Sequence, residues 1–314
     1  MGPETARHAW RVVVRKQLGR AGMIALIEFA ARLEHWTPPA LKIGLARLIG
    51  LAFFWLNPRI RRNTVANSSV VLNLPPGDPK VRRLARRSVQ AYAEHAVDFL
   101  RTFRLSADGL LRQTVKIEGY PFFEALHRLG RGGVLITAHF GNWEWCGGFV
   151  ARGRPVYAVA ETFPSRALTG LLDYVRARKN LRTLQVGRAA SGVLRVLRQG
   201  EFVALLADRP TPGHGVQVQF FGRPVWVPEG AAALAQRAGS PLLVGGVIRR
   251  REGYEVHGFP AIFVADDKPR GEAVREAMQR VMNDVETLIR KAPEQWYMFR
   301  DMWGEPHASR SAHA

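Results

Sequence analysis

The sequence predicts an α/β protein with a central, mostly parallel sheet flanked by helices, preceded by an N-terminal helical segment. From about residue 115 onwards, short apolar runs of strand length alternate with segments of helical periodicity, a pattern typical of a parallel sheet covered by helices. A chain of 314 residues is long enough for one large α/β domain with a helical appendage. We therefore expect one main domain rather than two.

The N-terminal segment, residues 1–57, combines basic positions with two apolar runs. Glu28 interrupts the first run and Arg47 the second, so neither has the roughly 18 uncharged residues that argue for a spanning helix. No convincing cleavage site of a signal peptide follows. Arginines beside Trp36 and Trp55 instead favour helices that lie in a membrane interface, and the alternative is that these helices pack on the main domain.

The main domain is expected to cover residues 58–305, and the polar residues 306–314 are expected to be a disordered tail. A Pro-Pro-Gly-Asp loop precedes an amphipathic helix over residues 80–103. We expect Glu94, His95 and Asp98 of this helix on a solvated face, although they are also candidates to reach a substrate cleft.

Four strands are predicted in the main domain, at residues 134–138, 155–160, 202–207 and 241–248. Three of them end in a polar residue, namely His139, Glu161 and Asp208. Because ligands of open α/β sheets bind outside the carboxyl ends of the strands, these residues are candidates for one site. Helix capping and ion pairing with neighbouring arginines are equally good readings of Glu161 and Asp208.

Two features follow the predicted strands. Residues 210–230 are rich in Pro and Gly and indicate a loop, a short strand and a turn. The last helix is predicted over residues 270–291, where Pro293 stops it.

The chain is strongly basic, with 46 Lys and Arg against 26 Asp and Glu, which gives a net charge of +20. Such a balance implies an anionic partner, whether nucleic acid, a membrane surface or a charged carrier. The basic residues carry no zinc-finger spacing and no RNA-binding signature, so a membrane surface fits better than a specific nucleic acid.

The single cysteine, Cys146, rules out an intramolecular disulfide. We expect it to be a small apolar helix residue packed on the sheet rather than a nucleophile. With one cysteine, no His-Glu-x-x-His motif and no paired histidines, the sequence gives little support for a structural zinc site, and we expect no metal.

His139 and Glu144 form the candidate catalytic pair. The histidine follows a buried strand, which fixes its backbone, and the glutamate follows a Gly-Asn turn and opens a helix. A carboxylate at this spacing is expected to hold one imidazole nitrogen, which leaves the other as a general base. Backbone N–H groups at Gly141, Asn142 and Trp143 are expected to cradle an oxyanion. The alternative is a strand-end histidine and a glutamate favoured by the helix dipole.

Residues 139–144, His-Phe-Gly-Asn-Trp-Glu, resemble the His-x4-Asp/Glu motif of the bacterial lipid A biosynthesis lauroyl/myristoyl acyltransferase family, to which the phosphatidylinositol mannoside acyltransferases are related. Further stretches resemble the same family in the same order, so that the resemblance extends from about residue 57 to about residue 303. They are residues 61–75, 206–209, 220–224, 230–235 and 292–296.

The resemblance implies a membrane-associated acyltransferase that passes a fatty acyl group from acyl carrier protein or acyl-CoA to a hydroxyl of a glycolipid. The glycolipid would be a lipid A precursor or a phosphatidylinositol mannoside, and no cofactor or metal beyond the acyl donor is implied. His139 would be the general base and Glu144 would orient it. The expected location is the cytoplasmic face of the inner membrane, in a peripheral or monotopic manner.

The residues expected to bind substrate come from several segments of the chain. One arginine of the run 176–179 is expected to hold an acidic group of a substrate or to pair with a site carboxylate, with Arg178 as the candidate, and the alternative is a solvated helix face. The Phe-Phe pair is expected to wall an acyl chain. The full set is Asn142, Glu161, Arg178, Asp208, Arg209, Phe220 and Phe221.

The sequence does not contain the motifs of two other classes of enzyme, the α/β hydrolases and the nucleotide-binding enzymes. It has no Gly-x-Ser-x-Gly motif of an α/β hydrolase and no Walker or dinucleotide-binding glycine motif opening a helix. The alternative that stays open is a non-catalytic basic protein that binds membranes or nucleic acid, whose binding would be sensitive to salt and independent of His139.

Overall fold

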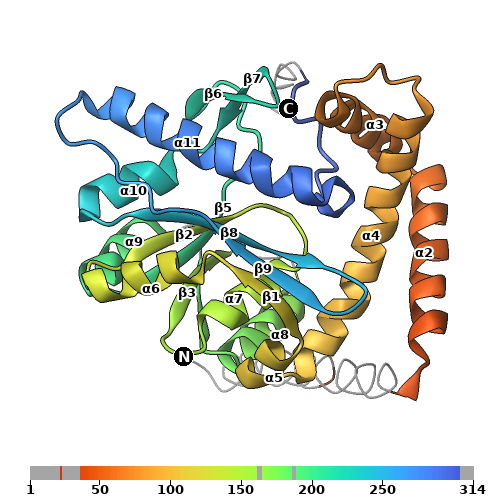
Figure 1. The fold of residues 1–314 in the computed structure, drawn as a ribbon, viewed down its shortest axis with the longest axis horizontal. Helices are drawn as coiled ribbons and strands as arrows, with labels where there is room; N and C mark the ends of the chain where they lie inside the picture. The colour runs from red at the N-terminus through yellow and green to blue at the C-terminus, as the bar shows by residue number, and fades with distance from the viewer. Residues whose placement is uncertain (1–21, 23–35, 161–164, 186–188, 305–314) are drawn as a thin grey trace, which may run out of the picture.

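The structure, a computed structural model, describes residue 22 and residues 36–160, 165–185 and 189–304. A seven-stranded sheet forms its centre, in the order β1-β9-β8-β2-β5-β3-β4 (Figure 1). All neighbouring strands pair in parallel except β8 and β9, so the predicted mostly parallel sheet is confirmed. The strands are β1 (Thr114–Glu118), β2 (Gly133–Thr137), β3 (Val156–Ala160), β4 (Leu181–Gln185), β5 (Phe202–Leu206), β8 (Leu242–Arg249) and β9 (Tyr254–Gly258).

Helices cover both faces of the sheet, because its central strands are apolar on both sides. In β2, Val134 and Ile136 contact the core shared with α9 (Ala189–Arg198), α10 (Gly230–Ala238) and α11 (Arg270–Lys291). Leu135 points the other way, into a smaller core. The helices on that side include α6 (Tyr120–Leu129) and α7 (Trp143–Val150), with α5 (Ala107–Arg112) and α8 (Arg166–Ala177) beside them.

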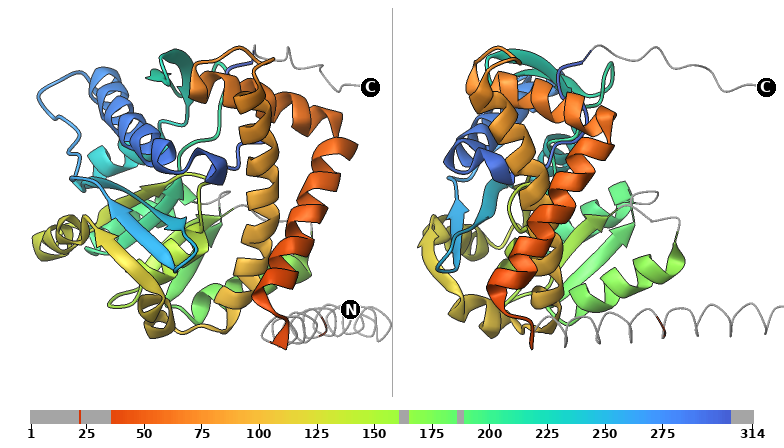
Figure 2. Two further views of the ribbon diagram at one scale, coloured as in Figure 1. Left: turned by 45° about the vertical axis from the view of Figure 1, so that its right-hand side comes forward. Right: turned by 90° about the vertical axis from the view of Figure 1, so that its right-hand side faces the viewer.

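Three helices precede the sheet: α2 (Pro39–Leu56), α3 (Pro58–Leu72) and α4 (Pro79–Arg104). Asn57 caps α3 by accepting from the Ile60 N–H, and Asp78 caps α4 by accepting from the Lys80 N–H. α2 lies along α4 at one side of the molecule (Figure 2).

The packing of α2 on α4 uses one narrow face, formed by Ala46, Gly50 and Phe54. A side chain at position 50 would lie 2.7 Å from Cα of Gln90, so glycine allows the two helices to approach closely. The other side of α2 is apolar and exposed, and by length and composition this helix is able to cross a membrane. It is therefore a candidate membrane-associating segment. The exposed apolar residues of this helix are Leu41, Leu45, Leu48, Ile49, Phe53, Trp55 and Leu56.

A short antiparallel hairpin, β6 (Val216–Phe220) and β7 (Arg223–Val227), packs on α11. Its two-residue turn, Phe221 and Gly222, has positive φ at both positions. The Phe221 N–H donates to the Glu286 carboxylate on α11 at 2.6 Å. The structure thus has two strands in a region where the sequence predicted one short strand and a turn.

The solvated face expected for Glu94, His95 and Asp98 is wrong, because all three side chains are buried. Glu94 pairs with Arg47 of α2, Arg87 of α4 and Arg249 of β8, and Arg249 also contacts Asp98 at 3.1 Å. Polar residues of α4 are therefore covered by α2 and by the end of β8 rather than by water. This ion network joins α2 to the sheet.

Candidate active site

His139 lies two residues beyond the last residue of β2, at the carboxyl edge of the sheet. The backbone around it is tightly held, because its carbonyl accepts from the Tyr297 N–H at 2.8 Å and Phe140 bridges to Trp296. Gly141 follows with φ of 54°, and a side chain there would overlap the carbonyl oxygen of Val247. The turn that presents the imidazole therefore depends on glycine.

Asp208 is the carboxylate that contacts the His139 ring. Its Oδ1 lies 2.7 Å from Nδ1 of His139, and its Oδ2 accepts from the His139 backbone N–H at 2.9 Å. The indole N–H of Trp296 donates to the same Oδ2 at 3.0 Å. Asp208 is fully buried while His139 is one-fifth exposed, so the pair presents the far side of the imidazole to the surroundings.

The electrostatics of this pair favour an ionised carboxylate. Burial alone would raise the pKa of Asp208, but the charge of His139, its two hydrogen bonds and the Trp296 N–H together lower that pKa below its usual value. A carboxylate held in this way fixes the imidazole with Nδ1 as donor, which leaves Nε2 as acceptor for a proton.

The structure gives His139 a different partner from the one that the motif spacing predicted. Glu144, in the first turn of α7, is bound instead by Arg176 of α8, which donates to its two oxygens at 2.5 Å and 3.2 Å. Asp208 reaches His139 because β5 is the neighbour of β2 and both strands end at the same edge. The carboxylate on the ring is thus a residue distant in sequence, and an orienting role for Glu144 stays a prediction.

Further titratable groups surround the Glu144 carboxylate. The stem of Lys179 lies against Gly148 of α7, and burial lowers the pKa of Lys179 to about 8 although Glu144 acts in the opposite direction. His95 of α4 also feels the charge of Glu144, and burial lowers its pKa to about 4. Glu144 therefore lies among two cationic groups and one neutral imidazole at neutral pH.

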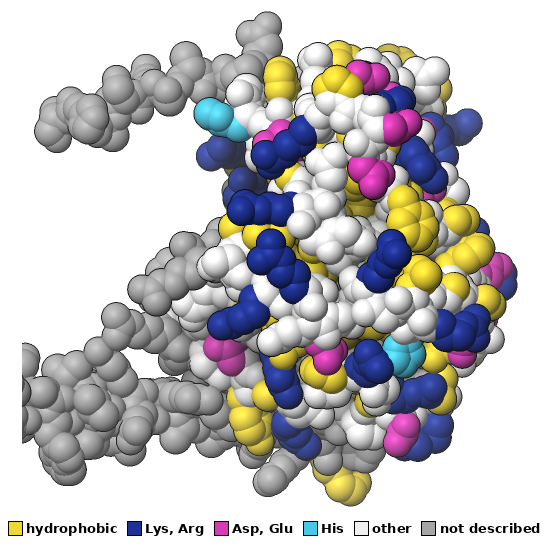
Figure 3. Space-filling model, turned by 90° about the vertical axis from the view of Figure 1, so that its left-hand side faces the viewer, with side chains coloured by type: hydrophobic (Ala, Val, Ile, Leu, Met, Phe, Trp, Pro, Cys, Tyr) yellow, Lys and Arg dark blue, Asp and Glu magenta, His cyan; other side chains and the backbone are white. Residues whose placement is uncertain are grey.

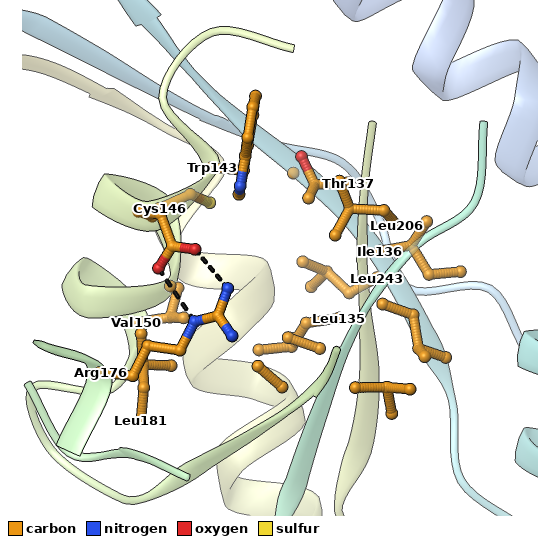
Figure 4. A pocket seen from close by; sticks show the side chains of 17 residues that line it. Leu135, Ile136, Thr137, Trp143, Cys146, Val150, Arg176, Leu181, Leu206 and Leu243 are labelled. Carbon is orange, nitrogen blue, oxygen red and sulfur yellow. Dashed lines mark hydrogen bonds and ion pairs between the residues drawn. The ribbon is translucent and has the colours of Figure 1, made fainter. Parts of the chain in front are cut away.

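An apolar pocket opens between α7 and the carboxyl half of the sheet (Figure 4). Leucine side chains of the strands, among them Leu135 and Leu243, face Arg176 and α7 across it. Thr137 and Trp143 bring the pocket next to His139, since the Trp143 ring centroid lies 5.8 Å from that of His139. The strand and helix residues that line it include Leu135, Ile136, Cys146, Val150, Ala158, Leu181, Ala204, Leu206 and Leu243.

The oxyanion cradle expected at the turn is not formed as predicted. The Gly141 N–H donates to the Gln295 carbonyl at 2.8 Å, and the Asn142 N–H donates to the Val247 carbonyl at 3.2 Å. The side chain of Asn142 caps α7 by accepting from the Trp145 N–H at 2.9 Å. These groups hold the turn in place, so two of the three expected donors are already bound.

The other expected site residues lie in different places. Arg178 is exposed at the end of α8, where its guanidinium lies over Tyr174, and Arg176 is the arginine of this run that reaches the pocket. Arg209 follows Asp208 and is half-buried. Glu161 lies outside the described residues.

Phe220 and Phe221 are buried against Trp296 rather than in the lining of the pocket. Their ring centroids lie 5.8 Å and 6.2 Å from that of Trp296. The Phe-Phe-Gly stretch therefore supports the indole that contacts Asp208. The notion that the Phe-Phe pair walls an acyl chain stays a prediction.

Cys146 lines the pocket, and burial raises the pKa of its thiol to about 12. At neutral pH it is therefore a thiol and not a thiolate nucleophile. Among the residues that the structure describes, no group of three or more His, Cys, Asp or Glu side chains is placed to hold a metal ion.

One face of the molecule shows how its Lys and Arg side chains are distributed. On the side of the molecule away from α2, Lys and Arg side chains are scattered among polar and apolar ones (Figure 3). On this face, the distribution fits general attraction to an anionic surface better than a defined groove for nucleic acid.

Comparison with known proteins finds acyltransferases both among families and among individual relatives. Residues 30–305 match the family described as bacterial lipid A biosynthesis acyltransferase. The chain is 28% identical over 247 residues to a phosphatidylinositol mannoside acyltransferase of two strains of Mycobacterium tuberculosis, which covers 76% of this chain and 75% of the relative. It is 26% identical over 252 residues to the enzyme of the same name from Mycolicibacterium smegmatis, with 78% and 79% covered.

Proposed function

Because the chain belongs to the bacterial lipid A biosynthesis acyltransferase family and is an enzyme that transfers acyl groups to a glycolipid, we propose that it esterifies a glycolipid hydroxyl with a fatty acyl group from acyl carrier protein or acyl-CoA. The observation that carries this proposal is the His139–Asp208 pair beside an apolar pocket. A base for the acceptor and a slot for an alkyl chain are the two parts that such a transfer needs.

The proposed reaction begins at Nε2 of His139. This nitrogen takes the proton of the acceptor hydroxyl as the oxygen attacks the thioester carbonyl carbon. The new C–O bond forms and the C–S bond breaks, after which the imidazolium returns its proton to the departing thiolate. No covalent acyl-enzyme is needed, because the acyl group passes directly to the acceptor oxygen and the proton passes through His139 to the leaving thiol.

Asp208 supports both halves of this cycle in our proposal. Through Nδ1 it holds the ring in the productive tautomer, and its negative charge stabilises the imidazolium that forms. The second hydrogen bond, from the His139 backbone N–H, fixes the carboxylate relative to the end of β2. The imidazole can thus gain and lose a proton without changing its position.

The acyl chain is proposed to occupy the pocket between α7 and the sheet. Its lining is mostly apolar and includes Trp143 and Leu181. Each buried CH₂ group contributes about 0.8 kcal/mol of hydrophobic free energy, so a slot of this kind favours a long alkyl chain over a short one. Arg176 and Glu144 form the polar part of the wall.

Glu144 is proposed to keep Arg176 in place at this wall. Removal of one partner of a largely buried ion pair leaves the other charge uncompensated, which costs more than the pair contributes. We therefore assign Glu144 to the shape and charge of the pocket, with the proton chemistry at Asp208 and His139.

The acceptor is proposed to be an anionic, sugar-bearing lipid. Two lines of reasoning support this choice: the names of the relatives, which are phosphatidylinositol mannoside acyltransferases, and the net charge of +20. We further propose that the enzyme works as a peripheral or monotopic protein at the cytoplasmic face of the inner membrane, with the exposed apolar side of α2 in the lipid.

The experiment that tests the proposal measures transfer of label from palmitoyl-CoA and from palmitoyl-acyl carrier protein to total lipid extract of the source organism. Wild type is compared with His139→Ala and with His214→Ala, an exposed histidine that does not line the pocket. We expect a labelled glycolipid with wild type and His214→Ala only. Equal labelling by His139→Ala would remove His139 as the base, and absence of transfer from both donors would refute the proposed activity.

A further inference from the structure

Trp296 provides the third hydrogen bond to the buried carboxylate of Asp208. Oδ1 of Asp208 faces the His139 ring, whereas Oδ2 accepts from the His139 backbone N–H and from the indole N–H of Trp296. The indole bond joins two side chains that are both buried and lie 88 positions apart in the sequence. Since an indole N–H donates only, this contact favours the ionised carboxylate.

The indole cannot turn away easily from Asp208. Its ring packs edge-on to Phe220 and to Trp303 and stacks on Phe221. Its backbone is held as well, because the Trp296 carbonyl accepts from the Ser88 hydroxyl at 2.8 Å. The direction of the N–H is therefore set by groups on both sides of the ring.

The same aromatic group is anchored to α11. Phe221 sits in the hairpin turn with a φ of 51°, its N–H bound to Glu286, and the Arg290 guanidinium lies 4.8 Å from its ring centroid. A bulky residue in this backbone conformation is unusual and needs such anchoring. The hairpin therefore places an aromatic ring where it supports Trp296.

We propose that Trp296 is a positioning residue of the acyl transfer, whose indole N–H holds Oδ2 of Asp208 so that Oδ1 stays aligned with Nδ1 of His139. This inference rests on the proposed function, in which His139 is the base. When His139 takes up a proton, Asp208 must remain ionised next to the new imidazolium, and the indole donor stabilises that charge without exchanging a proton of its own. Trp296 acts through Asp208 and touches neither substrate in this scheme.

The test compares Trp296→Phe with Trp303→Phe. Both variants remove one indole N–H from the same aromatic group, but the Trp303 N–H is buried without a hydrogen-bond partner among the described residues. We expect Trp296→Phe to lower kcat by about 10- to 100-fold with the KM values for both substrates unchanged. Trp303→Phe is expected to keep kcat near the wild-type value.

The pH profile separates positioning from a general loss of structure. Without the indole donor the pKa of Asp208 rises, so the coupled Asp208–His139 pair takes up its proton at a higher pH. The acid limb of the kcat profile should therefore move to higher pH in Trp296→Phe and stay in place in Trp303→Phe. A Trp296→His variant, which keeps a ring N–H donor, is expected to recover part of kcat.

A measurement that leaves Trp296 intact covers the case in which Trp296→Phe fails to fold. With ¹⁵N-labelled tryptophan, the indole N–H resonance of Trp296 is expected to shift in Asp208→Ala while that of Trp303 does not. The proposal is overturned if the Trp296 resonance is unchanged, or if folded Trp296→Phe matches Trp303→Phe in kcat and pH profile. If His139→Ala retains wild-type turnover, the proposed base is wrong instead, so the two failures are distinguishable.

Discussion

Asp208 and His139 lie 69 positions apart in the sequence, and the Asp208 carboxylate contacts both the ring and the backbone of the histidine, at 2.7 Å and 2.9 Å. Glu144, only five positions from His139, is bound by Arg176 instead. The two carboxylates thus differ in their contacts, and this difference gives separate expectations for their removal.

We predict that Asp208→Asn lowers kcat by about 100-fold or more, because a neutral amide neither stabilises the imidazolium nor fixes the tautomer of His139. Glu144→Gln is expected to have a smaller effect on kcat and a larger one on stability, since it leaves Arg176 without its partner. Steady-state kinetics and thermal melting of both variants make the comparison. If Glu144→Gln silenced the enzyme while Asp208→Asn remained active, Glu144 would be the orienting residue that the motif spacing predicted.

Gly141→Ala is predicted to destabilise the protein by about 3 kcal/mol or more, since the position has positive φ and the new methyl group would overlap the Val247 carbonyl. The free energy of unfolding in urea is the measurement. Gly153→Ala serves as the control, because no heavy atom lies within 4 Å of a Cβ placed there. Equal stability of the two variants would mean that the turn after β2 has room that the structure does not indicate.

The stability of the protein should fall as the pH is lowered from about 6.5 to about 4, in part because of His95. In the unfolded chain this imidazole takes up a proton near its ordinary pKa of 6.5, whereas burial among the rings of α4, Trp143 and Tyr297 lowers the folded-state pKa to about 4. The unfolded state then binds more protons, and the loss attributable to His95 is up to about 3 kcal/mol. The nearby charge of Glu144 acts in the opposite direction.

Urea unfolding of wild type and His95→Phe at about pH 7 and about pH 5 checks this expectation. The variant should lose less stability between the two pH values than wild type does. His214→Ala, at an exposed position, should behave like wild type. A parallel fall in wild type and His95→Phe would assign the acid sensitivity to other groups.

Replacement of Leu41, Leu45 and Leu48 by serine is predicted to weaken binding to vesicles of anionic lipid by at least about tenfold, since these exposed residues form one stripe of α2. Sedimentation with the vesicles measures binding, and circular dichroism checks that the fold is kept. A matched control replaces Ile117 and Leu129, which are exposed apolar residues away from α2, by serine. Unchanged sedimentation of the α2 variant would argue against α2 as the membrane contact.

The periodicity of hydrophobic residues in the sequence was sufficient to predict the main helices and strands. The four predicted strands and the helix over residues 270–291 are present, because each is a continuous apolar run or a clear stripe of core residues. β1, β4 and β9 were not predicted. β1 and β4 lie at the two edges of the sheet, where exposed positions interrupt the apolar pattern.

The partner of His139 was not predictable in the same way. The strands follow one another along the chain as β2, β3, β4 and β5, but among the last three it is β5, and not β3, that pairs with β2. Local spacing therefore pointed to Glu144, while the order of the strands, which periodicity does not contain, brings Asp208 to the histidine. Trp296 was recognisable only as part of a C-terminal motif, and its contact with Asp208 depends on the packing of α11 and the hairpin.

The burial of Glu94 and Asp98 of α4 was also not predictable, because the sequence of the helix does not show which distant elements pack on it. A helix with Glu94 and Asp98 on one side resembles a solvated amphipathic helix when read alone. Arg87 of α4 itself pairs with Glu94, but the other two arginine partners, Arg47 and Arg249, come from α2 and from the end of β8, whose placement the helix sequence does not contain.

The pairing of Thr137 with Leu206 limits where insertions and deletions can occur in homologous chains. His139 and Asp208 each follow their paired residue by two positions, so both side chains leave their strands in the same sense. Insertions between α7 and β5 would leave this alignment intact, whereas a single residue added between Leu206 and Asp208 would turn the carboxylate to the opposite side of the sheet. Homologous chains should therefore differ freely in length across the intervening loops and keep a constant two-residue step after each of these strands.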